Sequence, residues 1–143
     1  MTREVAFHFN APDKVGYACR LLRKAYRSGA RLWVRVPGDL LGALDVALWT
    51  QTPGDFIPHS RPGDAEAIRA RSPIHLDTEV QGDASRAVLV NLGDDLPPNA
   101  EGYERVIEVV TLSEADREAA RQRWRLYKAR GIEPLRHDLK LAP

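Results

Sequence analysis

Hydrophobic positions near the start of the chain first follow the spacing of a β-strand and then that of an α-helix. Residues 4–9 (EVAFHF) alternate imperfectly between apolar and polar side chains, which predicts a first strand. Asp13 is a favourable N-cap, and it predicts a helix that runs to about Ser28. Within that helix the spacing of three and four positions predicts one buried stripe, formed by Val15, Ala18, Cys19, Leu22, Ala25 and Tyr26. Cys19 is predicted to be a small core residue rather than a nucleophile.

Three later apolar runs have the length of strands. They cover residues 31–36 (RLWVRV), 87–92 (AVLVNL) and 106–110 (VIEVV). The second run is continuously apolar, which is typical of a central strand in a parallel sheet. Between residues 51 and 82 prolines and glycines interrupt the pattern, and only residues 74–77 suggest a short strand.

Two further helices are predicted. Asp39 caps a helix over residues 40–49, and Ser113 with Asp116 forms a capping pair that opens a helix over residues 114–130. Residues 132–143 show no strong pattern. Strands that alternate with helices favour an α/β fold, with a mostly parallel sheet and helices on both faces, in one domain over residues 1–143.

The last predicted helix carries a basic face. Successive residues turn by about 100°, so Trp124 shares one face with four cations: Arg117, Arg121, Arg125 and Lys128. The opposite face carries the predicted core stripe, formed by Leu112, Ala115, Ala119 and Leu126. One interpretation is a solvated charged face with Trp124 tucked under the tail. The other is a binding surface, because arginine pairs well with carboxylates and both residue types are enriched at interface hot spots.

The composition gives no sign of catalysis, a cofactor or a metal. The formal net charge of +1 argues against bulk attraction to DNA or to an anionic membrane. No phosphate-binding glycine loop follows the first strand, and the four histidines lack metal-ligand spacing. His59 could pair with Asp45 or Asp55, but no nucleophile accompanies them. A single cysteine, with no leader or membrane-spanning run, suggests a cytoplasmic protein.

Residues 44–59 (LDVALWTQTPGDFIPH) place large apolar side chains at a helix end and on a loop, where they must plug the core or meet a partner. This segment, together with RSGARLWV (residues 27–34) and VIEVV…RQRWRLYKARG near the end, resembles the chi subunits of the bacterial DNA polymerase III holoenzyme over nearly the whole length. The resemblance implies a nucleotide-binding-like fold without its phosphate loop, and no enzymatic activity.

The resemblance also implies two protein partners, the psi subunit of the clamp loader and the acidic, Phe-terminated C-terminal tail of single-stranded DNA-binding protein. The chain would contact DNA only indirectly, through these partner proteins. In the family the tail pocket corresponds to Trp49, Phe56, Val110, Arg121, Trp124 and Arg125 of this sequence. No motif assigns the psi surface. The alternative function is direct binding of single-stranded nucleic acid, with bases stacked on Trp49 and Trp124 beside the arginines.

Overall fold

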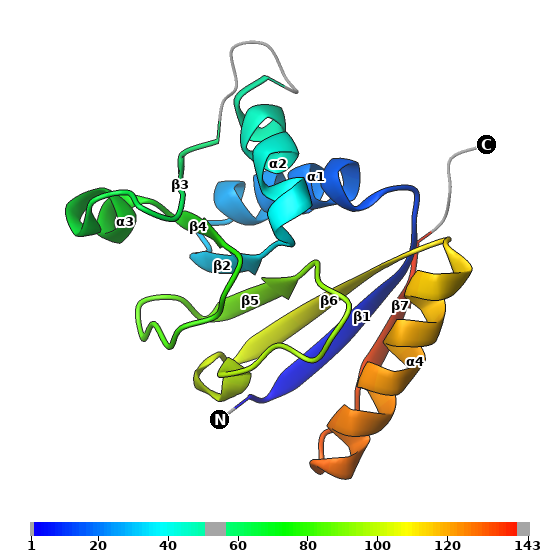
Figure 1. Cartoon of the computed structure of the whole chain (residues 1–143). Coiled ribbons are helices and arrows are strands. Elements are labelled where there is room, and N and C mark those ends of the chain that lie inside the picture. The colour runs from blue at the N-terminus through cyan, green and yellow to red at the C-terminus, as the bar shows by residue number, and fades with distance from the viewer. Residues whose placement is uncertain (1, 51–56, 140–143) are drawn as a thin grey trace.

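The computed structural model describes residues 2–50 and 57–139, in which seven parallel strands form one sheet (Figure 1). Their order across the sheet is β3-β4-β2-β5-β6-β1-β7. The strands are β1 (Glu4–Ala11), β2 (Leu32–Arg35), β3 (His59–Ser60), β4 (Ile74–Asp77), β5 (Val88–Asn91), β6 (Arg105–Thr111) and β7 (Leu135–Asp138). The helices are α1 (Lys14–Arg27), α2 (Gly38–Thr50), α3 (Glu66–Arg71) and α4 (Glu114–Ala129), with a 3-10 turn at Ala100–Gly102. The predicted α/β class is confirmed.

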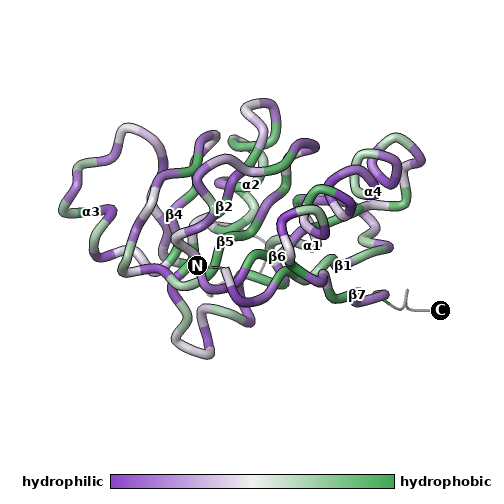
Figure 2. The backbone as a smooth tube through the Cα atoms, turned by 90° about the horizontal axis from the view of Figure 1, so that it is seen from below, coloured by the Kyte–Doolittle hydropathy of each residue, from purple (hydrophilic) through white to green (hydrophobic). Residues whose placement is uncertain are grey.

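The sheet separates two hydrophobic clusters, one on each face. Helix α2 adds Leu44 and Leu48 to the cluster that it shares with α1, whereas α4 adds Ala120 and Tyr127 to the other. Alternation along the strands supplies both clusters, and hydrophobic positions recur along the central strands in Figure 2. Helices α1 and α2 therefore cover one face and α4 covers the other, as the sequence predicts.

The first strand and helix follow most of their predicted pattern, but Tyr26, predicted in the buried stripe of α1, is 38% exposed in the last turn of the helix. Asp13 is the N-cap of α1, and its carboxylate accepts a hydrogen bond from the backbone N–H of Gly16. Cys19 is fully buried in the α1 stripe, and burial raises the pKa of its thiol to about 11. A thiol with so high a pKa stays protonated at neutral pH, which agrees with its prediction as a core residue.

The segment predicted as irregular holds more structure than its prolines and glycines suggested. Besides the expected β4, it contains the short strand β3 and helix α3. Arg86 fixes this region, because its buried guanidinium donates to the backbone carbonyl oxygens of Leu32, Arg69, Ser72 and Pro73. Asp83 pairs with the same guanidinium at 3.0 Å. An arginine that satisfies four carbonyls leaves no periodic signal in the sequence.

Two predicted caps differ in the structure. Helix α2 begins at Gly38, so Asp39 lies in its first turn rather than at the cap. Ser113 caps α4 by accepting from the N–H of Asp116, but the Asp116 carboxylate accepts from Thr111 and contacts Lys14 at 3.1 Å. Ser113 therefore acts as the N-cap, but the Asp116 carboxylate does not bond back to Ser113 as a capping box would require. Burial opposes the ionisation of Asp116, but these partners lower its pKa overall.

Strand β7 was missed, since residues 132–143 gave no pattern. It pairs in parallel with β1 at the edge of the sheet, with Leu135 opposite Ala6 and Arg136 opposite Phe7. All four of its residues are exposed. An edge strand that buries no face has no need of alternating apolar side chains, so its sequence is uninformative.

Candidate functional site

Helix α4 buries a different stripe from the one that its apolar residues predicted. The buried residues are Asp116, Ala120, Arg123 and Tyr127. By contrast Leu126 is 48% exposed, and Leu112, just before the helix, is 45% exposed. The predicted stripe of Leu112, Ala115, Ala119 and Leu126 is wrong. Three of the four buried residues carry polar groups, so apolar periodicity could not find them.

A buried carboxylate on β6 explains why α4 turns this way. Glu108 is fully buried and accepts hydrogen bonds from Arg123 at 3.0 Å, Tyr127 at 2.7 Å and Asn91 at 2.8 Å. Arg123 also donates to the carbonyl oxygen of Asp94 at 2.6 Å. Burial raises the pKa of Glu108, and the Arg123 guanidinium and the two other donors oppose that rise. This network fixes the rotation of α4 on the sheet.

That rotation brings Trp124 to the border between core and solvent. Its ring centroid lies 5.1 Å from that of Phe7 and 6.3 Å from that of Phe9, and the side chain is half-buried. The prediction that Trp124 faces away from the core is therefore wrong. Because β1 holds both phenylalanines, Trp124 has a fixed position with one part of its ring left open to a groove.

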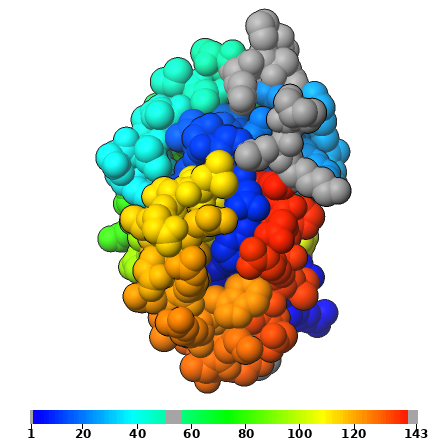
Figure 3. Space-filling model, turned by 90° about the vertical axis from the view of Figure 1, so that its right-hand side faces the viewer, coloured from blue at the N-terminus to red at the C-terminus, as the bar shows by residue number. Residues whose placement is uncertain are grey.

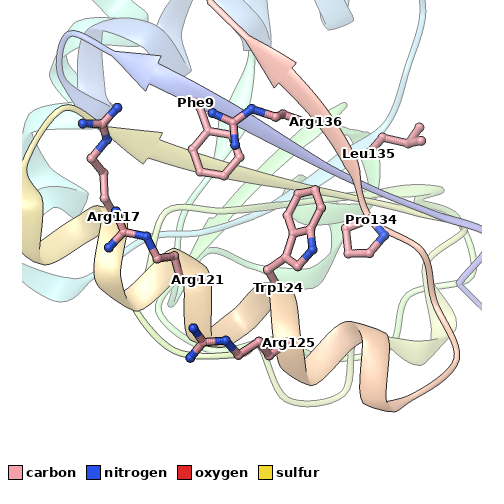
Figure 4. Close-up of a pocket in the computed structure, with 8 residues that line it drawn as sticks. All are labelled: Phe9, Arg117, Arg121, Trp124, Arg125, Pro134, Leu135 and Arg136. Atoms are coloured by element: carbon pink, nitrogen blue, oxygen red, sulfur yellow. The ribbon is translucent and has the colours of Figure 1, made fainter.

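The groove is a pocket of about 640 Å³ between α4 and β7. Figure 4 shows its lining, which is formed by Phe9, Arg117, Arg121, Trp124, Arg125, Pro134, Leu135 and Arg136. In Figure 3 a strip of β1 (blue) is visible between α4 (yellow to orange) and β7 (red). We call this site the α4–β7 pocket. It combines an apolar floor with four guanidinium groups, which suits a ligand that has carboxylates and a hydrophobic part.

Two arginines of the pocket, Arg117 and Arg121, make only weak contacts at the protein surface. Arg121 pairs with Glu118 at 2.8 Å and Glu114 at 3.4 Å, all at exposed positions, and these acids raise its pKa. Arg117 donates to the side-chain oxygen of Asn10 at 3.3 Å. Such surface contacts exchange readily for those of a ligand.

The remaining two cations stand at the edges of the pocket. Arg136 on β7 lies over the Phe9 ring, with its guanidinium carbon 4.4 Å from the ring centroid, and pairs with Asp138. Arg125 is exposed, and within residues 2–50 and 57–139 its guanidinium makes no hydrogen bond or ion pair. It is therefore open to a negatively charged ligand.

The structure brings together three of the six site residues that the sequence suggested. Arg121, Trp124 and Arg125 line the α4–β7 pocket. Val110 is fully buried in the cluster beneath α4 and does not line it. Trp49 lies on α2, across the sheet, and Phe56 lies outside the described residues. Val110 and Trp49 therefore do not share the α4–β7 pocket with the three residues of α4.

Sequence reasoning also missed part of the pocket. Phe9 could have been found, because it is an apolar residue on a predicted strand. Pro134, Leu135 and Arg136 could not, since they belong to the tail that showed no pattern. Only the pairing of β7 with β1 places these residues opposite α4.

A second exposed apolar surface lies at the end of α2. Val46 is 59% exposed and Trp49 is 51% exposed. The Trp49 ring packs against His59 with centroids 5.4 Å apart, and His59 contacts Asp45 at 2.6 Å and the carbonyl oxygen of Ile57 at 2.7 Å. We call Val46 and Trp49 the α2 surface. The hydrogen bonds of His59 place it beside Trp49 as a structural support.

At the N-terminus of α1, where nucleotide-binding folds bind phosphate, side chains of this protein take the place that a phosphate would need. The Asp13 carboxylate accepts from the backbone N–H of Gly16, and Lys14 contacts Asp116 at 3.1 Å and donates to the carbonyl oxygen of Leu92 at 2.8 Å. The part of the chain that the structure describes contains no group of three or more potential metal ligands. Its helices include none long and apolar enough to span a membrane.

A larger hollow of about 840 Å³ lies on the α1 face, between that helix and strands β1, β6 and β7. His8 lines it beside Tyr17, whose hydroxyl contacts His8 Nδ1, and beside His137, whose ring centroid is 4.9 Å away. Burial, together with electrostatic interactions with His137 and Arg105, lowers the pKa of His8 to about 4. His8 is therefore neutral at physiological pH.

Comparison with known proteins gives a consistent result. Residues 1–134 match the family described as DNA polymerase III chi subunit, HolC. DNA polymerase III subunit chi of Pseudomonas aeruginosa is 34% identical over 124 residues, which cover 85% of this chain and 84% of the relative. The subunits of the same name from Haemophilus influenzae and Escherichia coli are 26% and 25% identical, each over 80% of this chain and 79% and 78% of the relative.

Proposed function

The chain belongs to the family of DNA polymerase III chi subunits, and from this membership we propose that it is a non-catalytic accessory subunit that joins the polymerase to single-stranded DNA-binding protein. The link is the acidic, Phe-terminated C-terminal tail of that protein. A second contact, with the psi subunit, ties the chain to the clamp loader. Such an assembly works in the cytoplasm, where bacterial DNA is replicated.

The observation that carries the proposal is the combination of four guanidinium groups and two aromatic rings in the α4–β7 pocket. In the proposed complex the terminal ring of the tail packs on Trp124 and Phe9. Its carboxylate and the upstream acids pair with Arg125, Arg121 and Arg117. Arginine suits this role because its planar fork forms two parallel hydrogen bonds with a carboxylate.

The affinity for the tail should be modest and should depend on salt, because the tail is flexible and most arginines of the pocket are exposed. Ordering a flexible tail offsets much of the contact free energy, so we expect a dissociation constant of roughly micromolar size. The binding should weaken as salt rises, because exposed charges are screened over about 10 Å at 0.1 M salt. Transient capture of this kind would hold the polymerase near coated single strands and still let it move.

We assign the psi contact to the α2 surface. Val46 and Trp49 are both more than half exposed there, and large exposed apolar groups beside one another favour a protein partner. The α2 surface belongs to the face of the sheet opposite α4. Both partners could therefore bind at the same time, which a bridging subunit requires.

The test is fluorescence anisotropy with a labelled peptide that has the sequence of the cognate tail. The matched control peptide lacks only the terminal Phe. We expect micromolar binding of the tail and a loss of at least tenfold in the control, since the ring is the apolar anchor. No binding of the tail itself would refute the proposed capture.

Direct binding of single-stranded nucleic acid is tested in the same assay. An unlabelled oligonucleotide at low salt should fail to displace the peptide, because the net charge of only +1 gives little attraction for a polyanion. Displacement at low oligonucleotide concentration would favour a nucleic-acid-binding module instead.

A further inference from the structure

We propose that the α4–β7 pocket binds its peptide as an extended chain and selects carboxylates that stand two residues apart. The proposal rests on the proposed function, and it adds the conformation and the charge spacing of the ligand. It follows from the positions of the arginines on α4 and from the strand that forms the opposite wall.

The arginines of α4 form a regular ladder. Arg117, Arg121 and Arg125 are four residues apart and all line the pocket. A helix rises 1.5 Å per residue, so consecutive rungs are separated by about 6 Å along its axis. An extended chain rises about 3.3 Å per residue and points alternate side chains to the same side, so carboxylates at positions i and i+2 are about 6.6 Å apart. The two spacings agree to within the reach of an arginine side chain.

Adjacent acids do not fit this ladder equally well. In an extended chain neighbouring side chains point to opposite sides. If one carboxylate of an adjacent pair faces α4, the other faces β7, where the wall offers the apolar Pro134 and Leu135 and one cation, Arg136, which already pairs with Asp138 and lies over the Phe9 ring. The pocket therefore favours acids on one side of the chain and uncharged side chains on the other.

The charge pattern of the ligand also argues against a helical conformation. Strand β7 confines the ligand to a groove whose floor is a strip of β1, visible between α4 and β7 in Figure 3. In addition, acids near the C-terminal end of a helix are unfavourable because of the helix dipole. A short acidic peptide that ends in a free carboxylate is therefore better suited to an extended conformation.

Arg136 provides a comparison that separates the ladder from general attraction. It lies on β7 rather than on α4, with its guanidinium over the Phe9 ring. Its charge attracts any acidic peptide, but it is not a rung of the ladder. Arg121 is the middle rung, and without it the remaining two are about 12 Å apart, too far for acids at i and i+2.

The experiment measures three labelled peptides of identical composition and net charge by anisotropy at low salt. Each ends in Phe and contains two aspartates, which are adjacent, separated by one serine or separated by two residues, and only the second spacing places both acids on one side of an extended chain. We expect the peptide with one intervening serine to bind about threefold more tightly than the others. Arg121→Gln should abolish this difference, whereas Arg136→Gln should weaken all three peptides by a similar factor.

Each outcome has a distinct meaning. Equal affinities, or a persistent preference in Arg121→Gln, would overturn the ladder and leave the proposed function standing. Tightest binding of the peptide with two intervening residues would point to a helical ligand, in which such acids share one face, and would also overturn it. Failure of all three peptides and of the cognate tail would refute the proposed function itself. Arg121 and Arg136 are exposed, so thermal melts should show that both variants remain folded.

Discussion

The two tryptophans that the sequence suggested for one binding site lie on opposite faces of the sheet. Trp124 is half-buried against Phe7 and Phe9, with its open part in a pocket of guanidinium groups. Trp49 is 51% exposed at the end of α2, where its ring packs against that of His59. The two tryptophans therefore belong to two different surfaces, Trp49 to the α2 surface and Trp124 to the α4–β7 pocket. The difference teaches that topology, rather than residue type, decides which side chains can share a ligand.

The two surfaces also differ in how they are supported. The α4–β7 pocket stands on a buried ion pair, because Glu108 and Arg123 fix the rotation of α4. The α2 surface has a partly exposed support, in which Asp45 holds His59 and also pairs with Arg61 at 3.1 Å. We expect the first surface to depend on global stability and the second to respond to local changes.

The largest expected effect is on the stability of the α4 face. Arg123→Ala leaves the Glu108 carboxylate buried without its cation, and breaking a buried pair in this way costs about 3–5 kcal/mol of unfolding free energy. Chemical denaturation followed by circular dichroism measures the loss. Adding Glu108→Gln to Arg123→Ala should recover part of it, since an amide is cheaper to bury than a charge. A loss below about 1 kcal/mol would contradict the role of this pair.

The second prediction separates the two tryptophans in binding. Trp124→Ala should weaken binding of the tail peptide by about tenfold or more, because it removes the larger of the two aromatic rings in the pocket. Trp49→Ala should leave the tail affinity within about twofold, because that residue is across the sheet and energies at distant sites are nearly independent. Anisotropy with both variants measures the contrast. An equal loss in the two would mean that one ligand contacts both faces.

The third prediction concerns the α1 face. The pKa of His8 falls from 6.5 to about 4 on folding, so between these values the unfolded chain binds the proton more readily. Stability should therefore fall as the pH is lowered from about 6.5 to about 4, by a modest amount because His8 is only partly buried. Thermal melts across this range test it. His8→Gln should flatten the dependence, and an unchanged slope would assign it to other groups.

The smallest expected effect is an increase in affinity. Glu118 neutralises Arg121 in the free protein at 2.8 Å, so the peptide must displace it. Glu118→Gln should tighten the tail complex by about twofold at low salt and by less at high salt. Glu133→Gln serves as the control, since Glu133 pairs with Lys128, which does not line the pocket. Equal gains in both variants would indicate a general charge effect.

Elements that bury a regular apolar face could be predicted from the sequence. The N-cap Asp13, the stripe of α1 except Tyr26, and the strands around Val90 and Val109 follow from the sequence pattern, because the core requires apolar side chains at these positions. Part of the basic face could also be predicted, since Arg121, Trp124 and Arg125 do share one pocket. These are local patterns on single elements.

The rest depends on contacts between distant residues. The sequence VIEVV did contain a signal, because a glutamate inside an apolar run needs a buried partner, yet nothing local identified that partner as Arg123. The position of Arg136 depends on an edge strand that buries no face. The separation of Trp49 from Trp124 depends on the faces that α2 and α4 cover. Spacing along the chain contains none of this information.

The pairing of β1 with β7 has a consequence for the synthesis of the protein. The floor of the pocket, Phe9, is translated more than a hundred residues before Arg136, which covers it. Contacts of such separation form late, because a long loop must close first. A nascent chain released before β7 would therefore lack one wall of the pocket, and so incomplete products could not compete with finished subunits for the tail.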